Sequence, residues 1–300
     1  MDVIAFGGCY LDINTAGFLF DDTGLPVETE LRADYYKALP GGSAVNFCRR
    51  LTELGVSSTF IGMRGDDAVG DVIEHMLRAE GLTTDLLVAP GRRTNVSMSL
   101  VSEQGSHVTV GAGNANQALT VEQLMLHLAQ HLPKTRYLYM GTCYKLSGLL
   151  PQLSAIAVQA QRAGAQVIVD HGRYTDKTTP TERTLVRELV LGADLYVPSR
   201  QEFLLTWEVS SIQEGLRLLQ REAPSLTVVL KDGKAGAHYL RDNTVVTIPG
   251  VNVSRAYNLT GAGDTFNAGL LSGLLTGLDL EKAIEKGCAV AADHISKEVK

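Results

Sequence analysis

Long apolar runs are missing from this sequence of 300 residues. No window approaches the roughly 20 consecutive apolar residues of a membrane-spanning helix. The first eight residues also lack the basic stretch and following apolar stretch of a secretory signal. We therefore expect a cytoplasmic protein with no membrane partner.

Positive charge is also scarce. The chain has 27 Lys and Arg against 33 Asp and Glu, which gives a net charge of −6 at neutral pH. Such a chain has no electrostatic footprint for nucleic acid or an anionic membrane. Its 45% hydrophobic and 20% charged residues describe an ordinary globular protein with a substantial core. Small molecules are therefore the expected partners.

Cysteine is rare and has no motif. The four cysteines, Cys9, Cys48, Cys143 and Cys288, lie far apart, among apolar residues, and without C-x-x-C spacing. A catalytic thiol would need a nearby base, and the sequence identifies none. We interpret all four as buried free thiols.

Two nucleotide-binding motifs are absent as well. The first apolar run is followed by G-G-C-Y at 7–10, and no G-x-G-x-x-G leads into a helix there. This argues against a dinucleotide-dependent oxidoreductase. No G-x-x-x-x-G-K-[ST] occurs, so a P-loop kinase is also disfavoured.

Short apolar runs alternate with stretches of helical periodicity. The runs that we interpret as buried strands lie at residues 3–6, 137–140, 167–169, 195–197 and 227–230. Apolar residues recur at helical spacing in 44–54 and 72–77, and these segments end near Gly55 and Gly81. The alternation predicts an α/β fold with a mostly parallel sheet.

Two stretches interrupt this alternation. Residues 18–39 carry a turn-like D-D-T-G at 21–24, and residues 94–110 alternate apolar and polar side chains before Gln104-Gly105. Both are typical of antiparallel strands. We expect them to form a small β lid over a substrate cleft, inserted at about 14–39 and 94–112 in a single domain of residues 1–300.

A glycine-rich turn precedes a late amphipathic helix. Gly261, Ala262 and Gly263 allow close backbone approach to a ligand, and the first amides of the helix carry partial positive charge. This pattern favours binding of a phosphate or of a developing phosphoryl charge. Asp264 beside it would remain ionised and could accept the proton of an attacking alcohol.

Taken alone, a G-x-G-D turn has a plainer interpretation, in which the aspartate caps the helix. The longer string T-G-A-G-D-T-F-N-A-G, at 260–269, closely resembles the carboxy-terminal signature of the ribokinase-like (PfkB) carbohydrate kinase family. Other similarities follow the family's order along the chain. They are G-G-S-A-V-N at 41–46, G-M-R-G-D-D-A-V-G at 62–70, G-A-G-N-A at 111–115 and K-D-G-K-A-G at 231–236.

This resemblance implies a three-layer α/β/α sandwich with a mostly parallel central sheet and a small antiparallel β lid. It implies ATP as phosphoryl donor and Mg²⁺ bridging the phosphates. Edge strands of such a lid often pair between subunits, so we also expect a homodimer.

The resemblance also implies roles for the acceptor-side residues. Asp12 and Asn46 would hydrogen-bond the acceptor's hydroxyls, while Gly41 and Gly42 let it lie against the backbone. A turn-forming Asp12 and a solvent-facing Asn46 are the alternatives on the residues alone.

On the nucleotide side, the resemblance implies that Thr260 and the glycines after it form the anion hole. Lys231, Gly233 and Gly236 would flank the nucleotide. The family's N-x-x-E motif is matched by S-R-Q-E at 199–202. Ser199 is thus a nucleotide-side candidate and Glu202 an outer-shell candidate for the metal, with a solvated helix-start glutamate as the alternative.

Two departures from the family pattern change the expected ligands. Asn258 stands where many members have the aspartate of a monovalent cation site, which argues against a potassium requirement. D-H-G-R at 170–173 stands where relatives have D-x-N-x-R. Arg173 is therefore either an anion contact or a surface ion-pair residue.

The predicted function is that of an ATP-dependent kinase acting on an alcohol, most simply a hydroxymethyl group, of a sugar. A nucleoside acceptor is the alternative within the family, and Tyr10, Tyr36 and Tyr144 lie where an aromatic clamp for a base could form. A non-catalytic sugar-binding protein is a further alternative, which the intact base and glycines disfavour.

Overall fold

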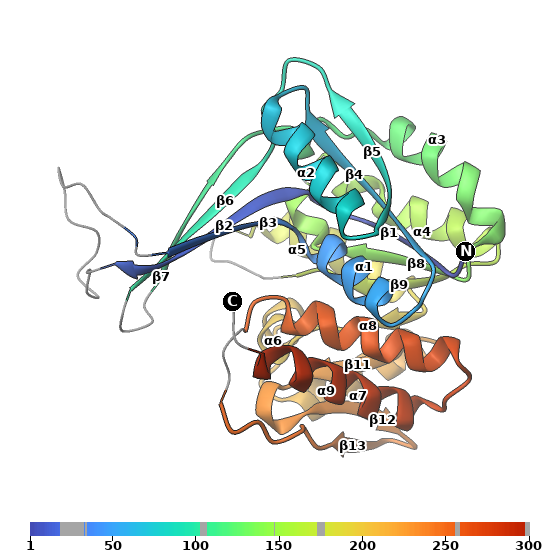
Figure 1. Cartoon of the computed structure of the whole chain (residues 1–300). Coiled ribbons are helices and arrows are strands. Elements are labelled where there is room, and N and C mark those ends of the chain that lie inside the picture. The colour runs from blue at the N-terminus through green and yellow to red at the C-terminus, as the bar shows by residue number, and fades with distance from the viewer. Residues whose placement is uncertain are drawn as a thin grey trace.

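A mostly parallel sheet forms the centre of the protein, which we describe from a computed structural model (Figure 1). The structure describes residues 1–18, 33, 35–102, 107–146, 148–172, 178–255 and 259–297. The nine strands of the sheet run in the order β13-β12-β11-β10-β9-β8-β1-β4-β5. Their bounds are β1 (Val3–Phe6), β4 (Ser58–Gly65), β5 (Thr83–Ala89), β8 (Tyr137–Gly141), β9 (Gln166–Asp170), β10 (Leu195–Tyr196), β11 (Thr227–Lys231), β12 (Ala237–Arg241) and β13 (Thr244–Ile248).

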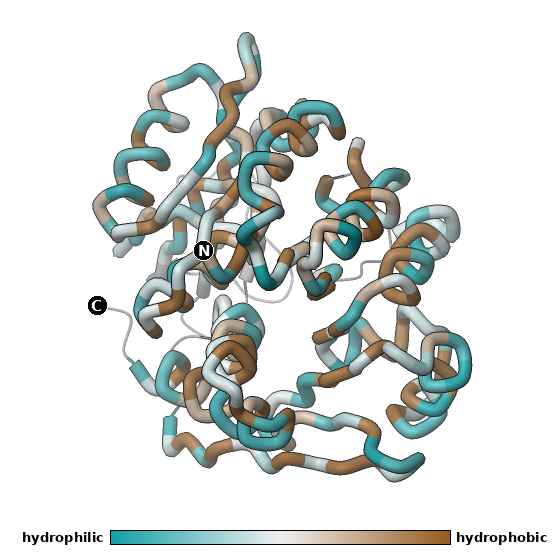
Figure 2. The backbone as a smooth tube through the Cα atoms, turned by 90° about the vertical axis from the view of Figure 1, so that its right-hand side faces the viewer, coloured by the Kyte–Doolittle hydropathy of each residue, from teal (hydrophilic) through white to brown (hydrophobic). Residues whose placement is uncertain are grey.

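Helices cover both faces of this sheet. One face packs against α1 (Ser43–Glu53), α2 (Ala68–Ala79), α8 (Ala262–Leu275) and α9 (Leu280–Ser296). The other packs against α3 (Val121–His131), α4 (Leu153–Arg162), α5 (Pro180–Leu191), α6 (Arg200–Trp207) and α7 (Ile212–Glu222). Teal and brown alternate along the helices in Figure 2, as expected for amphipathic helices between sheet and solvent.

Strand β1, which lies between β8 and β4, shows why the sequence has short, fully apolar runs. Successive side chains of a strand point to opposite faces. Val3 and Ala5 join the core on the α1 and α8 side, whereas Ile4 and Phe6 join the core on the other side. All four are fully buried, so a two-sided sheet requires an apolar residue at every position.

A second, four-stranded sheet forms the lid, projecting from one end of the main sheet (Figure 1). Its order is β3 (Tyr35–Gly41), β2 (Tyr10–Phe18), β6 (Val96–Ser102) and β7 (His107–Ala112). β2 pairs antiparallel with β3 and β6 antiparallel with β7, while β2 and β6 are parallel. The predicted turn at 21–24 lies outside the residues that the structure describes.

Most predicted elements are confirmed. Each of the five predicted strands is present, and the two predicted helices correspond to α1 and α2. Gly55 and Gly81 follow these helices with φ of 72° and 77°, the left-handed conformation that ends helices readily. Four strands of the main sheet were missed, because none of them is an uninterrupted apolar run: glycines interrupt β4, polar residues begin β5, and polar residues alternate with or flank the apolar ones in β12 and β13.

The predicted state of the cysteines is confirmed. All four are free and buried. Burial raises the pKa of the Cys9 and Cys48 thiols to about 12, so neither is an activated thiolate. Within the described part of the chain, no helix is long and apolar enough to cross a membrane.

Candidate active site

Asp264 lies in the first turn of α8, where that helix packs beside the start of α1 (Figure 1). Its two carboxylate oxygens have separate donors. The Ser43 hydroxyl donates to Oδ1 at 2.6 Å, and the Asn46 amide donates to Oδ2 at 3.1 Å. Both donors come from the first turn of α1, so packing of the two helices fixes the orientation of the carboxylate.

Partial burial sets the protonation of this carboxylate. Desolvation and the nearby charge of Asp170 raise the pKa of Asp264 to about 6, while the hydrogen bonds from Ser43 and Asn46 oppose the rise. With this pKa the carboxylate is mostly ionised at pH 7, which is the state that a base requires. A base with a pKa just below neutrality is well matched to accepting a proton from an alcohol.

The glycine turn before α8 has the predicted open geometry. Gly261 is the N-cap residue with φ of 74°, and the Asn46 Nδ2 lies 3.4 Å from where a Cβ on it would stand. A Cβ on Gly263 would lie 3.5 Å from the Lys231 Nζ. Among the described residues, the backbone amides of Gly263 and Asp264 have no acceptor. They are therefore free for an anion at the positive end of the helix dipole.

Lys231 lies beneath this turn in a buried ion pair. Its ammonium group donates to Asp170 Oδ2 at 2.8 Å and to Asn267 Oδ1 at 3.2 Å. Burial would raise the pKa of Asp170, but the charge and hydrogen bonds of Lys231, with a hydrogen bond from Asn267, hold it below its usual value. A fixed positive charge thus lies close to the predicted anion hole.

A chain of hydroxyl groups joins this ion pair to the base. The Tyr139 hydroxyl lies 3.2 Å from the Ser43 hydroxyl and accepts a hydrogen bond from Asn267 Nδ2 at 3.1 Å. Tyr139 itself is fully buried and stacks on Phe47 of α1 at 3.9 Å between ring centroids. Ser43 and Tyr139 therefore connect Asp264 by hydrogen bonds to the ion pair of Asp170 and Lys231 at the ends of β9 and β11.

The predicted acceptor residues Asp12, Gly41 and Gly42 lie where the start of β2 pairs with the end of β3. A Cβ on Gly41 would lie 1.8 Å from Asp12 Oδ2, and a Cβ on Gly42 would lie 2.1 Å from the Gly8 carbonyl oxygen. Gly42 also has φ of 114°, which side chains rarely adopt. Both positions require glycine, because the backbone lies directly against Asp12 and the β1–β2 connection.

Asp12 is itself an unusual carboxylate. Burial raises its pKa to about 6, and the charges of Lys145 and Arg49 partly oppose the rise. Asn46 has a role that the sequence did not indicate: besides donating to Asp264, it accepts a hydrogen bond from Arg49 Nη1 at 2.9 Å. It is therefore an orienting group for the base as well as an acceptor-side candidate.

The predicted nucleotide turn joins β11 to β12. Gly233 begins a short 3₁₀ turn, Gly233–Ala235, with φ of 54° and open space on its Cα. Gly236 has φ of 95° and lies against the Ile248 carbonyl, where a Cβ would be only 2.1 Å away. Because Lys231 immediately precedes this turn, the turn lies on the same side of the molecule as the anion hole.

Ser199 and Glu202 form a capping box at the start of α6. The Ser199 amide donates to Glu202 Oε2 at 2.8 Å, and the Ser199 hydroxyl accepts from the Glu202 amide at 3.4 Å. Helix capping alone thus explains why Ser199 and Glu202 occur at these two positions. In the described part of the chain, no group of three or more His, Cys, Asp or Glu could hold a metal ion.

Thr260 is bound through its carbonyl group. His294 of α9 lies between two partners: Nε2 is 2.8 Å from the Thr260 carbonyl oxygen and Nδ1 is 3.0 Å from Arg50 Nη2. A carbonyl can only accept and a guanidinium can only donate, so the two contacts fit the tautomer with its proton on Nε2. This contact ties the glycine turn to α1 and α9.

Sequence reasoning missed several residues of this site: Ser43, Tyr139, Asn267, Lys145, Arg50 and His294. Asn267 had a detectable signal, since it lies three residues after Asp264 and thus on the same face of α8. The others become neighbours of the site only through the sheet order. Asn258, Arg173 and the side chain of Tyr144 lie outside what the structure describes.

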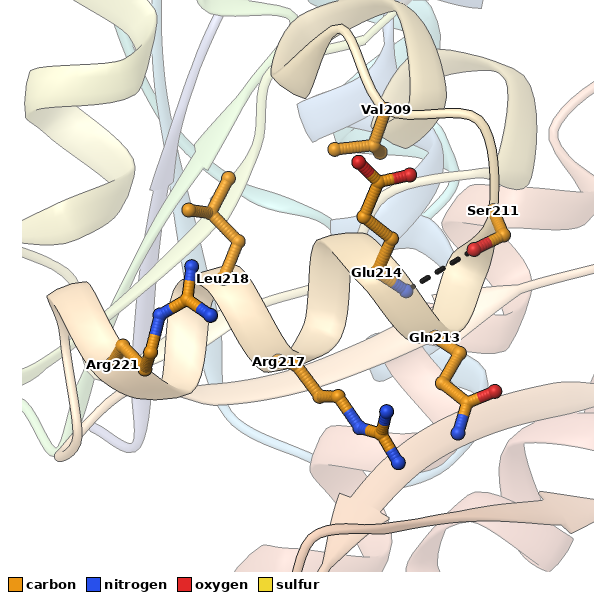
Figure 3. A pocket seen from close by; sticks show the side chains of 7 residues that line it. All are labelled: Val209, Ser211, Gln213, Glu214, Arg217, Leu218 and Arg221. Atoms are coloured by element: carbon orange, nitrogen blue, oxygen red, sulfur yellow. Dashed lines mark hydrogen bonds between the residues drawn. The ribbon is translucent and has the colours of Figure 1, made fainter.

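A separate pocket lies on α7, with a volume of about 470 Å³. Leu218, Glu214 and Arg221 point to one side of the helix, while Gln213 and Arg217 point to the other (Figure 3). The pocket shares no residue with the surroundings of Asp264.

Known carbohydrate kinases resemble this chain over most of its length. The profile of the pfkB family carbohydrate kinases matches residues 3–298. The ribokinase of Bacillus subtilis is 23% identical over 290 residues, which cover 94% of this chain and 89% of that enzyme. The 5-dehydro-2-deoxygluconokinase of Shouchella clausii is 26% identical over 306 residues, covering 99% and 90% of the two chains.

Solved structures share the fold across the chain. A candidate ribokinase II from E. coli in complex with ATP and Mg²⁺ superposes with a TM-score of 0.82 at 20% identity, covering 99% of this chain and 93% of its own. The ribokinase of Thermotoga maritima gives a TM-score of 0.78 at 19% identity, with the same coverage of 99% and 93%. The fold, the order of the motifs and a family profile that spans nearly every residue lead to one conclusion, that this chain belongs to the PfkB family of carbohydrate kinases.

Proposed function

We propose that this protein transfers the γ-phosphoryl group of ATP to a hydroxyl, most simply a hydroxymethyl group, of a carbohydrate, with Asp264 as general base. One observation carries the proposal: the Asp264 carboxylate is held by Ser43 and Asn46 beside first-turn amides of its own helix that have no acceptor among the described residues. Phosphoryl transfer depends mainly on alignment and charge stabilisation, and this arrangement places the base next to the anion-binding turn.

In the proposed reaction, Asp264 accepts the proton of the acceptor hydroxyl as its oxygen attacks the γ-phosphorus. A new bond forms between that oxygen and phosphorus, the bond to the β-phosphate oxygen breaks, and ADP leaves. The amides of Gly263 and Asp264 stabilise the charge on the transferring group, and the buried Lys231 adds positive charge beneath them.

The nucleotide would lie along the turns of Gly233 and Gly261, which leave the backbone exposed. Mg²⁺ would neutralise the phosphates. Because no described group of side chains could hold a metal by itself, the ion would be bound chiefly by the nucleotide, as is usual for Mg²⁺. Glu202 remains the candidate for its outer shell. A relative in complex with ATP and Mg²⁺ supports this part of the proposal.

Asp12 and Asn46 would bind the acceptor's hydroxyls, while Gly41 and Gly42 would let it lie against the backbone. The lid would exclude water. The names of the relatives do not fix the acceptor, since ribokinase and 5-dehydro-2-deoxygluconokinase both occur among them. For a nucleoside acceptor, the predicted aromatic clamp has less support. The Tyr10 ring has the Lys145 ammonium group over it, and Tyr36 is 70% exposed.

The proposal is tested by screening sugars, sugar acids, polyols and nucleosides for ADP release that requires both ATP and Mg²⁺. Asp264→Asn is assayed beside the wild type, with circular dichroism as the folding control. We expect at least one carbohydrate to support turnover and the substitution to reduce kcat by about 10²–10⁴-fold. Equal activity in the two proteins would reject the base, and a wild type that binds carbohydrates without turnover would favour a binding protein.

A further inference from the structure

Tyr10 and Asp12 form one side of the acceptor site. They lie two residues apart on β2, so their side chains share a face of the strand. Both lie against the glycine pair: the position of a Cβ on Gly42 is 3.5 Å from Tyr10 Cδ2, and that on Gly41 is 1.8 Å from Asp12 Oδ2. A group placed over the Tyr10 ring is therefore beside the acceptor.

Lys145 is such a group. It ends the 3₁₀ turn Cys143–Lys145 directly after β8, and its Nζ lies 5.2 Å from the centroid of the Tyr10 ring, within cation–π range. The turn is well anchored. The Thr142 amide donates to the Asp170 carbonyl at 2.8 Å, and Cys143 and Leu146 are buried on either side of the lysine.

Among the described residues, the ammonium group of Lys145 contacts the Tyr10 ring but no carboxylate. Within the part of the chain that the structure describes, it makes no hydrogen bond and no salt bridge. The charge of Lys145 acts to lower the pKa of Asp12. No Asp12 oxygen lies at salt-bridge distance from the ammonium group. The other cation that acts on Asp12 differs: Arg49 pairs with Glu80 at 2.6 Å and donates to the Pro40 carbonyl at 2.7 Å. Lys145 is thus an exposed cation at the acceptor site whose ammonium group has no hydrogen-bond or salt-bridge partner among the described residues.

We propose that the acceptor is a sugar acid whose carboxylate binds the Lys145 ammonium group, while its hydroxyls bind Asp12. This inference rests on the proposed kinase function. A carboxylate carries the single negative charge that one ammonium group balances. A phosphate dianion usually requires more donors, often an arginine fork, and the neighbouring Arg49 is already paired.

The test compares acids with neutral partners of the same carbon number, D-gluconate with D-glucitol and D-glucuronate with D-glucose, and includes glucose 6-phosphate. The readout is the ratio of kcat/KM for each acid to that for its neutral partner. We expect a wild-type ratio above 10, lowered at least tenfold in Lys145→Met through KM for the acid and largely retained in Lys145→Arg. The preference should also weaken as ionic strength rises.

Lys134→Met is the matched control. Lys134 is an exposed lysine just before β8, so its substitution changes the net charge equally at the opposite end of the strand that precedes Lys145. Its ratio should stay within twofold of the wild type. Equal ratios in wild type and Lys145→Met, or a wild-type preference for the neutral partners, would overturn the inference. A preference for glucose 6-phosphate that depends on Lys145 would also overturn it, because the group bound by Lys145 would then be a phosphate.

Calorimetric binding of the same compounds without ATP separates this inference from the kinase proposal. If acids bind more tightly than neutral partners and Lys145→Met removes the difference, the Lys145 site stands even when no turnover occurs. If turnover occurs with neutral sugars and the Lys145 variants are indistinguishable from the wild type, the kinase stands and the sugar-acid inference fails.

Discussion

At the residue scale, the same burial that would suit Asp264 to act as a base should lower the stability of the fold. The pKa of Asp264 rises from 3.8 to about 6 on folding, so the folded chain binds this proton more tightly than the unfolded chain. Its contribution is fully present below pH 4 and is lost as the pH rises towards 6. Above pH 6, the ionised group carries a constant penalty.

Asp264→Asn should therefore stabilise the protein near neutral pH while it removes activity. We expect a gain in the free energy of unfolding of about 1–3 kcal/mol at pH 8, which becomes smaller at pH 5 because wild-type Asp264 is then largely protonated. Urea denaturation of both proteins at the two pH values measures this difference. A loss of stability at pH 8, or an equal gain at both, would contradict the assignment of the raised pKa to this group.

At the element scale, a substitution in the first turn of α8 should change anion binding without changing the stability of the fold. Gly263 has ordinary helical backbone, and a Cβ there would meet only Lys231 at 3.5 Å. Gly263→Ala should thus fold with nearly wild-type stability yet lose kcat at least tenfold, since the methyl group occupies the anion site. Steady-state kinetics beside a melting curve checks this.

Gly81→Ala is the control for backbone strain. Gly81 follows α2 with φ of 77° and open space around it, so alanine there should cost about 1–2 kcal/mol without affecting turnover. If Gly263→Ala instead retains full activity, the glycine turn does not bind the transferring group.

The ion pair between β9 and β11 is a second feature at this scale. Lys231→Met leaves Asp170 as an unpaired buried charge, so we expect a loss of about 3–5 kcal/mol in unfolding free energy. Adding Asp170→Asn should restore much of that stability, but not activity. A double-mutant cycle by chemical denaturation measures the coupling, and additive effects of the two substitutions would show that the pair does not act as a unit.

Sequence reasoning predicted local elements well and long-range contacts poorly. Buried strands such as β1 are visible because every position must be apolar, and α1 and α2 are visible through periodicity and their terminal glycines. In contrast, Lys231 and Asp170 are 61 residues apart, and Ser43 and Tyr139 are 96 apart. These contacts depend on which strands are neighbours, and the strand order cannot be obtained from periodicity.

The candidate site was predictable in the same uneven way. The base and the glycines lie in contiguous strings, so Asp264, Gly261 and Gly263 could be assigned directly. Neither Lys145 nor the groups that orient the base, such as Ser43 and Tyr139, could be assigned a role from a motif. Lys145 lies over the Tyr10 ring only because β8 ends near the start of the lid.

At the scale of the whole molecule, one face of the lid is apolar and open. The register places Ile13 beside Met98, and Met98 opposite Val110, on the face away from Asp12. Tyr36, paired with Thr15, lies on the same face. The exposed fractions are 70% for Tyr36, 52% for Val110 and 37% for Met98. Such a face is suited to packing against a second copy of the chain.

We therefore predict a homodimer formed through the lids. The wild type should sediment with twice its mass of 32.3 kDa at micromolar concentration, and Val110→Lys should shift it towards the monomer. Val158→Lys, at a 42% exposed valine of α4, should leave the mass unchanged. A monomeric wild type, or equal effects of the two substitutions, would reject this interface.

The pH dependence of kcat/KM in wild type and Ser43→Ala tests the central claim about Asp264 most directly. The Ser43 hydroxyl donates to the ionised carboxylate and lowers the pKa of Asp264, so its removal should raise that pKa. We predict that wild-type kcat/KM falls about tenfold per pH unit below pH 6, and that this acid limb moves to higher pH in Ser43→Ala. An acid limb that is absent, or one that stays in place after the substitution, would contradict the assignment of Asp264 as a general base tuned by its surroundings.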